Sequence, residues 1–255
     1  MINFKATKKM LQRWTSEIID FNKLIHGFLK LLRYINDWKK YIQLNAAEPI
    51  RLINTYPRVH DKTKETYFDK HYFYQNIWAF KKIYESECDS HIDVGSKIDF
   101  IGFLTTITKV TFIDIRPLIL NLDNLGSKKG NILALPYKDG SVKSLSCLHV
   151  AEHIGLGRYG DSLDPLGTQK AAKELSRVLA PNGTLYFSVP IGKPKLCFNA
   201  HRIHSTNQIL NYFSDLELIE LSGVDDNGNF IRNINKDILD SCVYGCGFFI
   251  FSKIK

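Results

Sequence analysis

The stretch HIDVGSKIDFIGFLTTITKVTFID, residues 91–114, decides the fold of this chain. In order it contains a strand pattern over 91–94, the turn residue Gly95, an apolar helical stretch near 98–106 and a second strand pattern over 109–113. Strands that alternate with crossover helices are typical of a parallel sheet covered by helices on both faces.

The same alternation continues toward the C-terminus. Further strands are predicted at 131–133, 144–150, 184–189, 216–221 and 244–252, and further helices at 71–86, 168–179 and 206–213. We therefore expect an α/β fold, a doubly wound and mostly parallel seven-stranded sheet, over residues 71–255. The last two strands are predicted to form an antiparallel hairpin at one edge of that sheet.

Residues 1–70 form a separate N-terminal helical extension in this interpretation. Apolar residues recur every three to four positions over 21–42, which predicts a long amphipathic helix, and 45–70 reads as an irregular connector. The opposite face of the helix is basic. Such a helix contacts an anionic membrane surface or, alternatively, packs on the following domain or on a second subunit in a homo-oligomer.

Charge and cysteine content narrow the class of protein. The chain of 255 residues has 34 Lys and Arg against 26 Asp and Glu, and most of the net charge of +8 lies in residues 1–40. The nearly neutral remainder argues against a nucleic-acid partner. Five scattered cysteines, without a signal peptide or a long apolar run, predict a cytoplasmic protein, peripheral at the inner membrane surface if the helix binds lipid.

Two acidic residues mark a ligand site at the ends of the first two strands. Asp93 precedes Gly95 and Ser96, and Asp114 follows 21 residues later at the end of VTFID. A carboxylate at the second position can accept hydrogen bonds from both hydroxyls of a ribose, which favours an adenosine-containing ligand. Alternatively, both acids cap the helices that follow them.

The later motifs LPYKDGS (135–141), EHI (152–154) and RVLAPNG (177–183) occur in the order seen in a known family. The chain resembles the class I S-adenosylmethionine-dependent methyltransferases over residues 88–254. The segments 157–167 and 189–205 are similar to a little-characterised subgroup met in bacterial surface-polysaccharide gene clusters.

This resemblance implies S-adenosylmethionine as the cofactor and assigns residues to it. Asp93, Gly95 and Ser96 would lie at its methionine end, and Asp114 would bind the ribose. Two further cofactor-binding residues are implied, namely Asn131 near the adenine and His149 near the sulfonium. The sequence departs from the family where Lys97 replaces the second loop glycine, a position at which a side chain can hinder close approach of a ligand.

Two polar loops, one after the fourth strand and one after the fifth, supply candidates for the acceptor site. Methyl transfer to a hydroxyl needs a general base, for which we predict His153 and His201, with Asp161 as a base or as an orienting carboxylate. The predicted substrate-binding residues are Arg158, Tyr159, Asp164, Asn199 and Arg202. The two arginines suit an anionic acceptor.

The leading hypothesis is therefore O-methylation of a sugar or sugar-phosphate precursor of a surface glycan. The alternatives are a catalytically altered relative that transfers a sugar or sugar phosphate, and a non-catalytic scaffold in glycan assembly. We predict no metal site: a set of Asp161, Asp164 and His201 is conceivable, but no compact ligand motif supports it.

Overall fold

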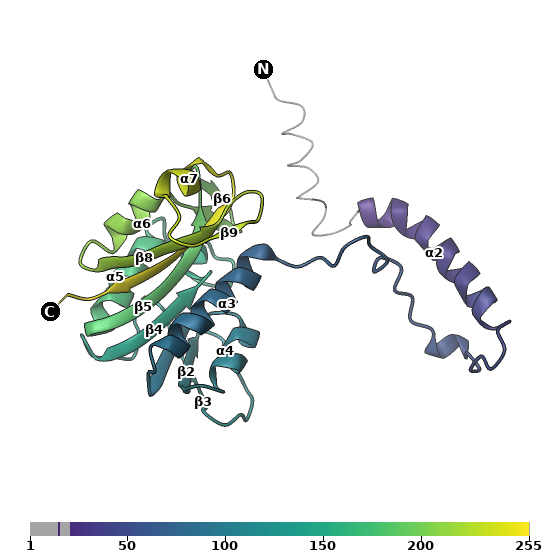
Figure 1. Ribbon diagram of the computed structural model, residues 1–255, viewed down its shortest axis with the longest axis horizontal. Helices are drawn as coiled ribbons and strands as arrows, with labels where there is room; N and C mark the ends of the chain where they lie inside the picture. Colours follow the sequence, from purple (N-terminus) through teal and green to yellow (C-terminus); the bar gives the residue numbers. More distant parts are fainter. Residues whose placement is uncertain (1–14, 16–20, 255) are drawn as a thin grey trace, which may run out of the picture. The chain divides into compact units, whose positions relative to one another are not determined.

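The computed structural model describes residue 15 and residues 21–254 (Figure 1). Contacts divide the chain into two units, Met1–Tyr67 and Phe68–Lys255. The sequence-based boundary, after residue 70, lies three residues further on. Within the described part of the chain, every helix is too short or too polar to cross a lipid bilayer.

The first unit contains the long helix α2 (Phe21–Tyr41) and the short η1 (Leu52–Asn54). On α2 the side chains of Phe28, Leu29 and Leu32 are half or more exposed. The connector folds back on the same unit, where Arg33 donates to the carbonyl of Val59 at 3.2 Å. Residues 1–14 and 16–20 of the predicted membrane-contacting segment lie outside the described residues.

The second unit is built on an eight-stranded sheet with the order β3-β2-β1-β4-β5-β10-β8-β9. Its strands are β1 (Ser90–Val94), β2 (Lys109–Asp114), β3 (Leu125–Lys129), β4 (Val142–Leu148), β5 (Leu179–Ile191), β8 (Glu217–Val224), β9 (Phe230–Ile231) and β10 (Gly245–Ser252). A separate two-stranded sheet pairs β6 (Lys195–Cys197) with β7 (His201–Ile203). The helices are α3 (Lys70–Glu85), α4 (Ile98–Leu104), η2 (Ala151–His153), α5 (Gly167–Val178), α6 (Thr206–Tyr212) and α7 (Lys236–Ser241).

The predicted fold class is confirmed. Strands β3, β2, β1, β4 and β5 are parallel neighbours. The chain moves outward from β1 to β3 and then returns to place β4 on the other side of β1, so the order reverses between β1 and β4. That reversal is where open α/β sheets bind ligands. The eighth strand, β9, has two residues and extends the predicted seven.

The predicted antiparallel pairing of the last two long strands at one end of the sheet is confirmed. β8 and β10 pair antiparallel, with β10 on the inner side, between β5 and β8, and the two-residue β9 outermost. The inner position of β10 follows from its sequence, GCGFFIFS, in which the first seven residues are buried. A strand that is apolar on both faces requires a neighbour on each side and a helix layer on each face.

The third strand was predicted at the wrong place. The apolar run at 131–133 forms a turn, held by an isolated bridge between Asn131 and Ala134, and the strand is LGSKK at Leu125–Lys129. This edge strand is largely exposed and has no alternating apolar residues, so its sequence lacks the usual signal. The apolar Ile132 instead packs into the core.

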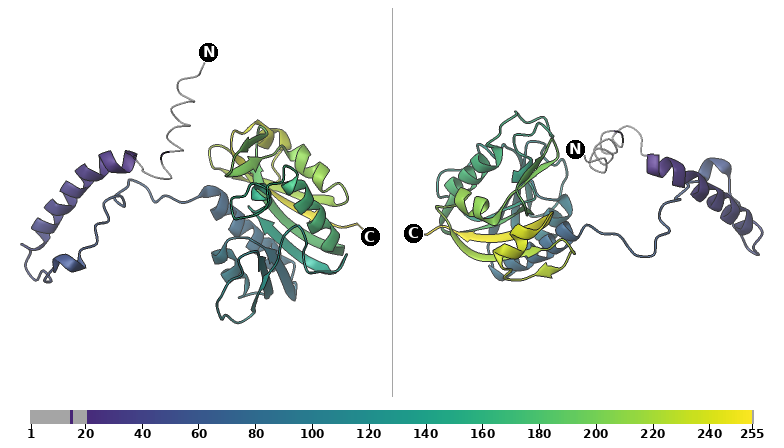
Figure 2. Two further views of the ribbon diagram at one scale, coloured as in Figure 1. Left: turned by 180° about the vertical axis from the view of Figure 1, so that it is seen from behind. Right: turned by 90° about the horizontal axis from the view of Figure 1, so that it is seen from above.

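Helices lie on both faces of the sheet (Figures 1 and 2), and a hydrophobic cluster fills the space on each face. Helices α3 and α4 pack on one face, and α5, α6 and α7 contribute to the cluster on the other. Strand β10 shows the alternation directly, because Phe248 belongs to the first cluster and Phe249 to the second. Both faces being covered, ligands can reach the sheet only at its ends.

Candidate active site

A cleft lies at the carboxyl ends of β1, β2 and β4, where the strand order reverses. It comprises two cavities of about 550 and 620 Å³. Residues shared by both cavities are Gly95, Asp114, Arg116, His149, His153 and Tyr159. The cleft therefore contains members of the predicted cofactor set and of the predicted acceptor set.

The buried carboxylate of Asp93 holds the loop after β1 in place by hydrogen bonds. This carboxylate is fully buried, accepts the Ser96 N–H at 2.9 Å and accepts the hydroxyl of Ser146. Burial raises the pKa of Asp93 to about 6, and the serine hydrogen bonds oppose that shift. Asp93 lines neither cavity, so its observed part is to hold the loop, while Ser96 also ties the loop to β4 by accepting the Leu148 N–H at 3.1 Å.

Gly95 forms the close wall of the cleft. Its φ of +71° lies in the left-handed region, and a Cβ built there would meet a methyl group of Val150 at 3.1 Å. The same Cβ would lie 3.5 Å from Oδ2 of Asp114, which places the carboxylate beside the glycine. A ligand in the cleft can therefore approach the backbone of Gly95 closely and contact Asp114 at the same time.

Asp114 and Asn131, both predicted to bind the adenosine part of the cofactor, line the 550 Å³ cavity. Asp114 ends β2, and its Oδ1 accepts the Arg116 N–H at 2.7 Å. Asn131 lines the 550 Å³ cavity, and its Oδ1 accepts the Leu133 N–H at 2.9 Å, which closes the turn that replaces the predicted strand. The carboxylate of Asp114 is the more available acceptor of the two.

Lys97, the departure from the family pattern, directly precedes α4 and lines the 620 Å³ cavity. Its Nζ lies 4.3 Å from the centre of the Tyr72 ring. A cation over an aromatic face is held electrostatically. The lysine therefore adds a positive charge to the wall of the cleft.

Tyr72 and its neighbour His71 reach the site from α3, outside the residues that the motifs identified. Asp69 caps this helix by accepting the N–H groups of both residues. The sequence showed only an amphipathic helix there, and nothing in its spacing indicated that its first turn faces the ends of the strands. Arg116 was also missed, although it follows Asp114 by two residues.

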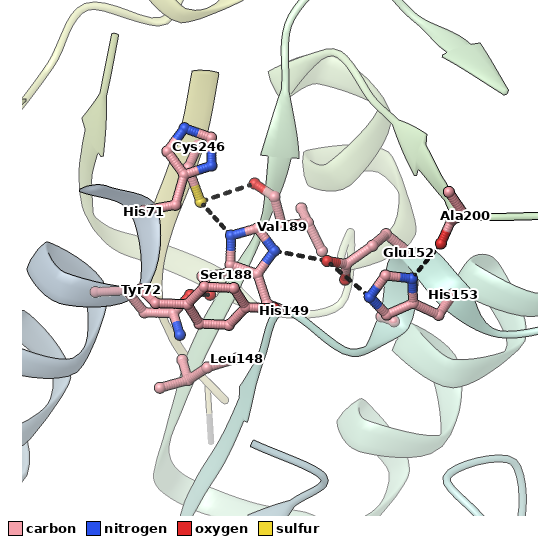
Figure 3. Close-up of polar contacts among 12 residues, drawn as sticks. His71, Tyr72, Leu148, His149, Glu152, His153, Ser188, Val189, Ala200 and Cys246 are labelled. Carbon is pink, nitrogen blue, oxygen red and sulfur yellow. Dashed lines mark hydrogen bonds and ion pairs between the residues drawn. The ribbon is translucent and has the colours of Figure 1, made fainter. Parts of the chain in front are cut away.

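A buried polar network connects His149, Glu152, His153 and Cys246 (Figure 3). The Nδ1 atom of His149 lies 2.7 Å from Oε1 of Glu152, and its Nε2 lies 3.2 Å from the sulfur of Cys246. His149 has a φ of +57°, a strained conformation for this residue type that turns its ring into the network at the end of β4. Burial lowers the pKa of His149, but Cys246 and Glu152 outweigh it and raise the pKa well above its usual value.

Of the three predicted catalytic residues, His153 has the clearest access to the cleft, because it lines both cavities. Its Nδ1 donates to the carbonyl of Ala200 at 2.6 Å, and its Nε2 lies 3.6 Å from Oε1 of Glu152. His201 lines neither cavity, and burial lowers its pKa. Asp161 lines one cavity but shapes its own loop, since it accepts the N–H groups of Gly155 and Tyr159.

The predicted substrate-binding residues fall into different places. Tyr159 lines both cavities, with the guanidinium carbons of Arg116 and Arg158 at 4.5 and 5.1 Å from its ring centre. Arg158 also donates to the carbonyl of Ala200 at 3.0 Å. Together these residues form an aromatic and cationic wall.

The other three lie farther from the centre of the cleft. Arg202 donates to the carbonyls of Ile154 and Asp164 at 2.6 and 2.9 Å, so its guanidinium holds together the two ends of the loop between η2 and α5. Asp164 accepts the amine of Lys170 at 2.6 Å and borders the 550 Å³ cavity. Asn199 is exposed on the loop between β6 and β7 and lines neither cavity.

Part of the chain matches a known protein family. Residues 139–237 match the family described as Caenorhabditis protein of unknown function, DUF268. No curated protein matches the chain.

Among solved structures, the chain is similar to YcgJ of Bacillus subtilis, with 13% identity, a TM-score of 0.51 and coverage of 72% of this chain and 99% of the other. It is also similar to a sarcosine dimethylglycine methyltransferase candidate from Galdieria sulphuraria (13%, TM-score 0.51, coverage 71% and 86%). The N-methyltransferase NodS of Bradyrhizobium japonicum, crystallised with S-adenosylhomocysteine, gives 13%, a TM-score of 0.50 and coverage of 72% and 88%. At this identity the likeness defines the fold, which is the Rossmann-like fold of class I methyltransferases.

Proposed function

We propose that this chain is an S-adenosylmethionine-dependent methyltransferase that binds its cofactor in the cleft at the ends of β1, β2 and β4. The observation that carries the proposal is the juxtaposition of Asp114 with Gly95. The glycine leaves the space that any Cβ would fill, and the carboxylate beside it suits a ribose. The fold of the solved structures supports the same assignment.

The acceptor in this proposal is an anionic hydroxyl compound, a sugar or sugar-phosphate precursor of a surface glycan. Three cations, Lys97, Arg116 and Arg158, lie at 4.3 to 5.1 Å from the rings of Tyr72 and Tyr159. Sugar rings stack on aromatic faces, and guanidinium groups bind phosphate or carboxylate. The wall that these five side chains form supports an acceptor with both features.

His153 is the proposed general base. Its Nδ1 donates to a backbone carbonyl, so the neutral ring carries the proton on Nδ1 and leaves the lone pair of Nε2 to accept one. The cofactor, when bound, supplies an electrophilic methyl group. Nε2 of His153 would take the proton that the acceptor hydroxyl loses on receiving the methyl group, with S-adenosylhomocysteine as the leaving group, and Glu152 at 3.6 Å would stabilise the resulting imidazolium.

Calorimetric titration tests the cofactor assignment. We expect S-adenosylmethionine and S-adenosylhomocysteine to bind the wild type with micromolar affinity, and Asp114→Ala to weaken both by tenfold or more. Asp123→Ala, an exposed acid outside the cleft, is the matched control. A folded wild type that binds neither compound would overturn the proposal.

The second candidate, sugar or sugar-phosphate transfer, is favoured by Lys97 and Arg116. Both line the 620 Å³ cavity and would suit the diphosphate of a nucleotide sugar. Calorimetry also separates the two functions. A sugar or sugar-phosphate transferase would bind nucleotide sugars and not S-adenosylmethionine. A scaffold would bind neither class.

For the N-terminal unit we propose peripheral contact with the anionic inner surface of the membrane. The support is the exposed apolar side chains of Phe28, Leu29 and Leu32 on the same helix as the exposed Lys39 and Lys40. A second subunit packing on the same apolar residues is the alternative.

A further inference from the structure

Three potential metal ligands meet beside the cleft, although they are far apart in the sequence. His71 comes from the first turn of α3, His149 follows β4, and Cys246 lies in β10. One ligand atom from each lies within 4.8 Å of the others. Cys246 is fully buried, His149 is nearly so, and His71 is partly exposed.

The contacts around these residues orient their rings as metal ligands are oriented. Nδ1 of His149 donates to Oε1 of Glu152 at 2.7 Å, so Nε2 faces the sulfur of Cys246 at 3.2 Å, and a metal ion bound there would take the place of the Nε2 proton. Metal-binding histidines almost always donate their second ring nitrogen to such a carboxylate or to a backbone carbonyl. The ring of His71 packs against the rings of His149 and Tyr244, with ring centres 5.8 and 5.0 Å apart.

The charge balance also favours a cation. Glu152 is a fully buried acid whose Oε2 has no hydrogen-bond partner among the described residues. A divalent ion beside His149 would offset the buried carboxylate and stabilise Cys246 as a thiolate.

We propose that His71, His149 and Cys246 bind a divalent transition-metal ion of the zinc type. Two imidazoles and a thiolate are donors that zinc and similar ions prefer, and that magnesium and calcium do not. Ligand atoms around a tetrahedral zinc ion lie about 3.3 to 3.8 Å apart. The His149–Cys246 pair is near that spacing, and His71 would need a shift of about 1 Å.

Three protein ligands leave a fourth position for water or a ligand. Because His149 also lines both cavities, the ion would lie next to the cleft. This set could not be recognised from sequence, since its members are separated by 78 and 97 positions and share no motif. The inference does not depend on the methyltransferase proposal.

Cobalt titration of the reduced, metal-free full chain tests the site. Co²⁺ bound to a thiolate gives a charge-transfer absorption in the near ultraviolet, and tetrahedral Co²⁺ gives strong visible bands. We expect both to appear and saturate at one equivalent, and Zn²⁺ to abolish them by competition.

Three variants assign the ligands. Cys246→Ser should lose the charge-transfer band, and His71→Ala should weaken Co²⁺ binding by about tenfold or more. Cys88→Ser is the matched control, because this cysteine bonds to Thr108 away from the cluster and should leave the titration unchanged. If Cys246→Ser does not fold, His71→Ala, at a partly exposed helix start, decides alone. A folded wild type without the charge-transfer band, or a band that survives in both ligand variants, would overturn the proposal.

Discussion

His149 and Glu152 form a buried pair in which Nδ1 of the histidine lies 2.7 Å from Oε1 of the glutamate. The pair sits one turn apart at the end of β4, the point where the cleft opens. Each member determines the protonation of the other. Burial alone would raise the pKa of Glu152, but His149 and its hydrogen bond lower it below the usual value.

Glu152→Gln should lower the free energy of unfolding by about 3 kcal/mol at pH 7, because it removes one partner of a buried ion pair. The raised pKa of His149 gives the wild type stability that is present below pH 6.5 and is lost as the pH rises through the folded-state value. The difference between wild type and variant should therefore shrink at alkaline pH. Urea unfolding at pH 7 and pH 10 measures it, with the exposed Glu85→Gln as control. Equal differences at both pH values would contradict the ion pair.

Gly95→Ala should impair both stability and cofactor binding. The positive φ of this residue costs a non-glycine residue roughly 1 to 2 kcal/mol, and the added methyl would crowd Val150. Gly102→Ala on α4 is the matched control, since nothing lies within 4 Å of a Cβ there, and it should stabilise the protein by about 0.5 to 1 kcal/mol. Thermal unfolding and S-adenosylhomocysteine titration check both. Unchanged affinity in Gly95→Ala would remove this glycine from the binding site.

His153→Ala should reduce methyl transfer by about 100-fold or more while leaving S-adenosylmethionine affinity nearly unchanged, as expected for a general base. His201→Ala should have a smaller effect, because His201 lines neither cavity. Transfer of radiolabelled methyl groups to a panel of sugar phosphates gives the rates. Wild-type rates in both variants would exclude the proposed base.

The strand-end positions of Asp93, Asp114 and His149 could be predicted because the turn after each parallel strand follows from local sequence. Local sequence does not indicate which residues from distant parts of the chain meet at the cleft. Asp93 was predicted to contact the cofactor. Its carboxylate instead accepts a hydrogen bond from Ser146, which is 53 positions away on the neighbouring strand β4. His71 and Cys246 were missed for the same reason, since only packing of α3 and β10 brings them to His149.

The acceptor loops illustrate a second limit. Arg202 and Asp161 have the chemistry of substrate ligands, but both are engaged by backbone groups of the loop between η2 and α5. Long loops without regular structure must satisfy many backbone polar groups, and charged side chains are the nearest partners. Sequence alone does not distinguish a side chain that closes a loop from one that contacts a ligand.

The N-terminal helix can be tested in the full chain. If α2 binds membrane, vesicles containing phosphatidylserine should capture the protein and neutral vesicles should not, and Lys39→Glu with Lys40→Glu should weaken binding by tenfold or more, at about 1 kcal/mol per lost cation. Light scattering supplies the alternative outcome. A dimer that dissociates in Phe28→Ser with Leu32→Ser, and no vesicle binding, would assign the apolar face to a second subunit.

Asp93 gives the most direct pH test of the loop under the cleft. Its pKa rises from 3.8 to about 6 on folding because the carboxyl group is buried. A raised pKa means that the folded state holds the proton more tightly, so the associated stability is present below pH 3.8 and is lost as the pH rises through 6. In Asp93→Asn the side chain at this position is uncharged at every pH. We therefore expect the stability of wild type relative to Asp93→Asn to fall by about 3 kcal/mol between pH 4 and pH 7.5.

Urea unfolding of both proteins at the two pH values measures that change, and contributions of the buried histidines cancel in the difference. Asp123→Asn, at an exposed position, should show no such trend. A relative stability that instead rises with pH would mean that Asp93 is ionised in the folded protein. The hydrogen bonds from Ser96 and Ser146 would then hold a buried carboxylate at the base of the cleft, and the loop after β1 would be fixed by charge.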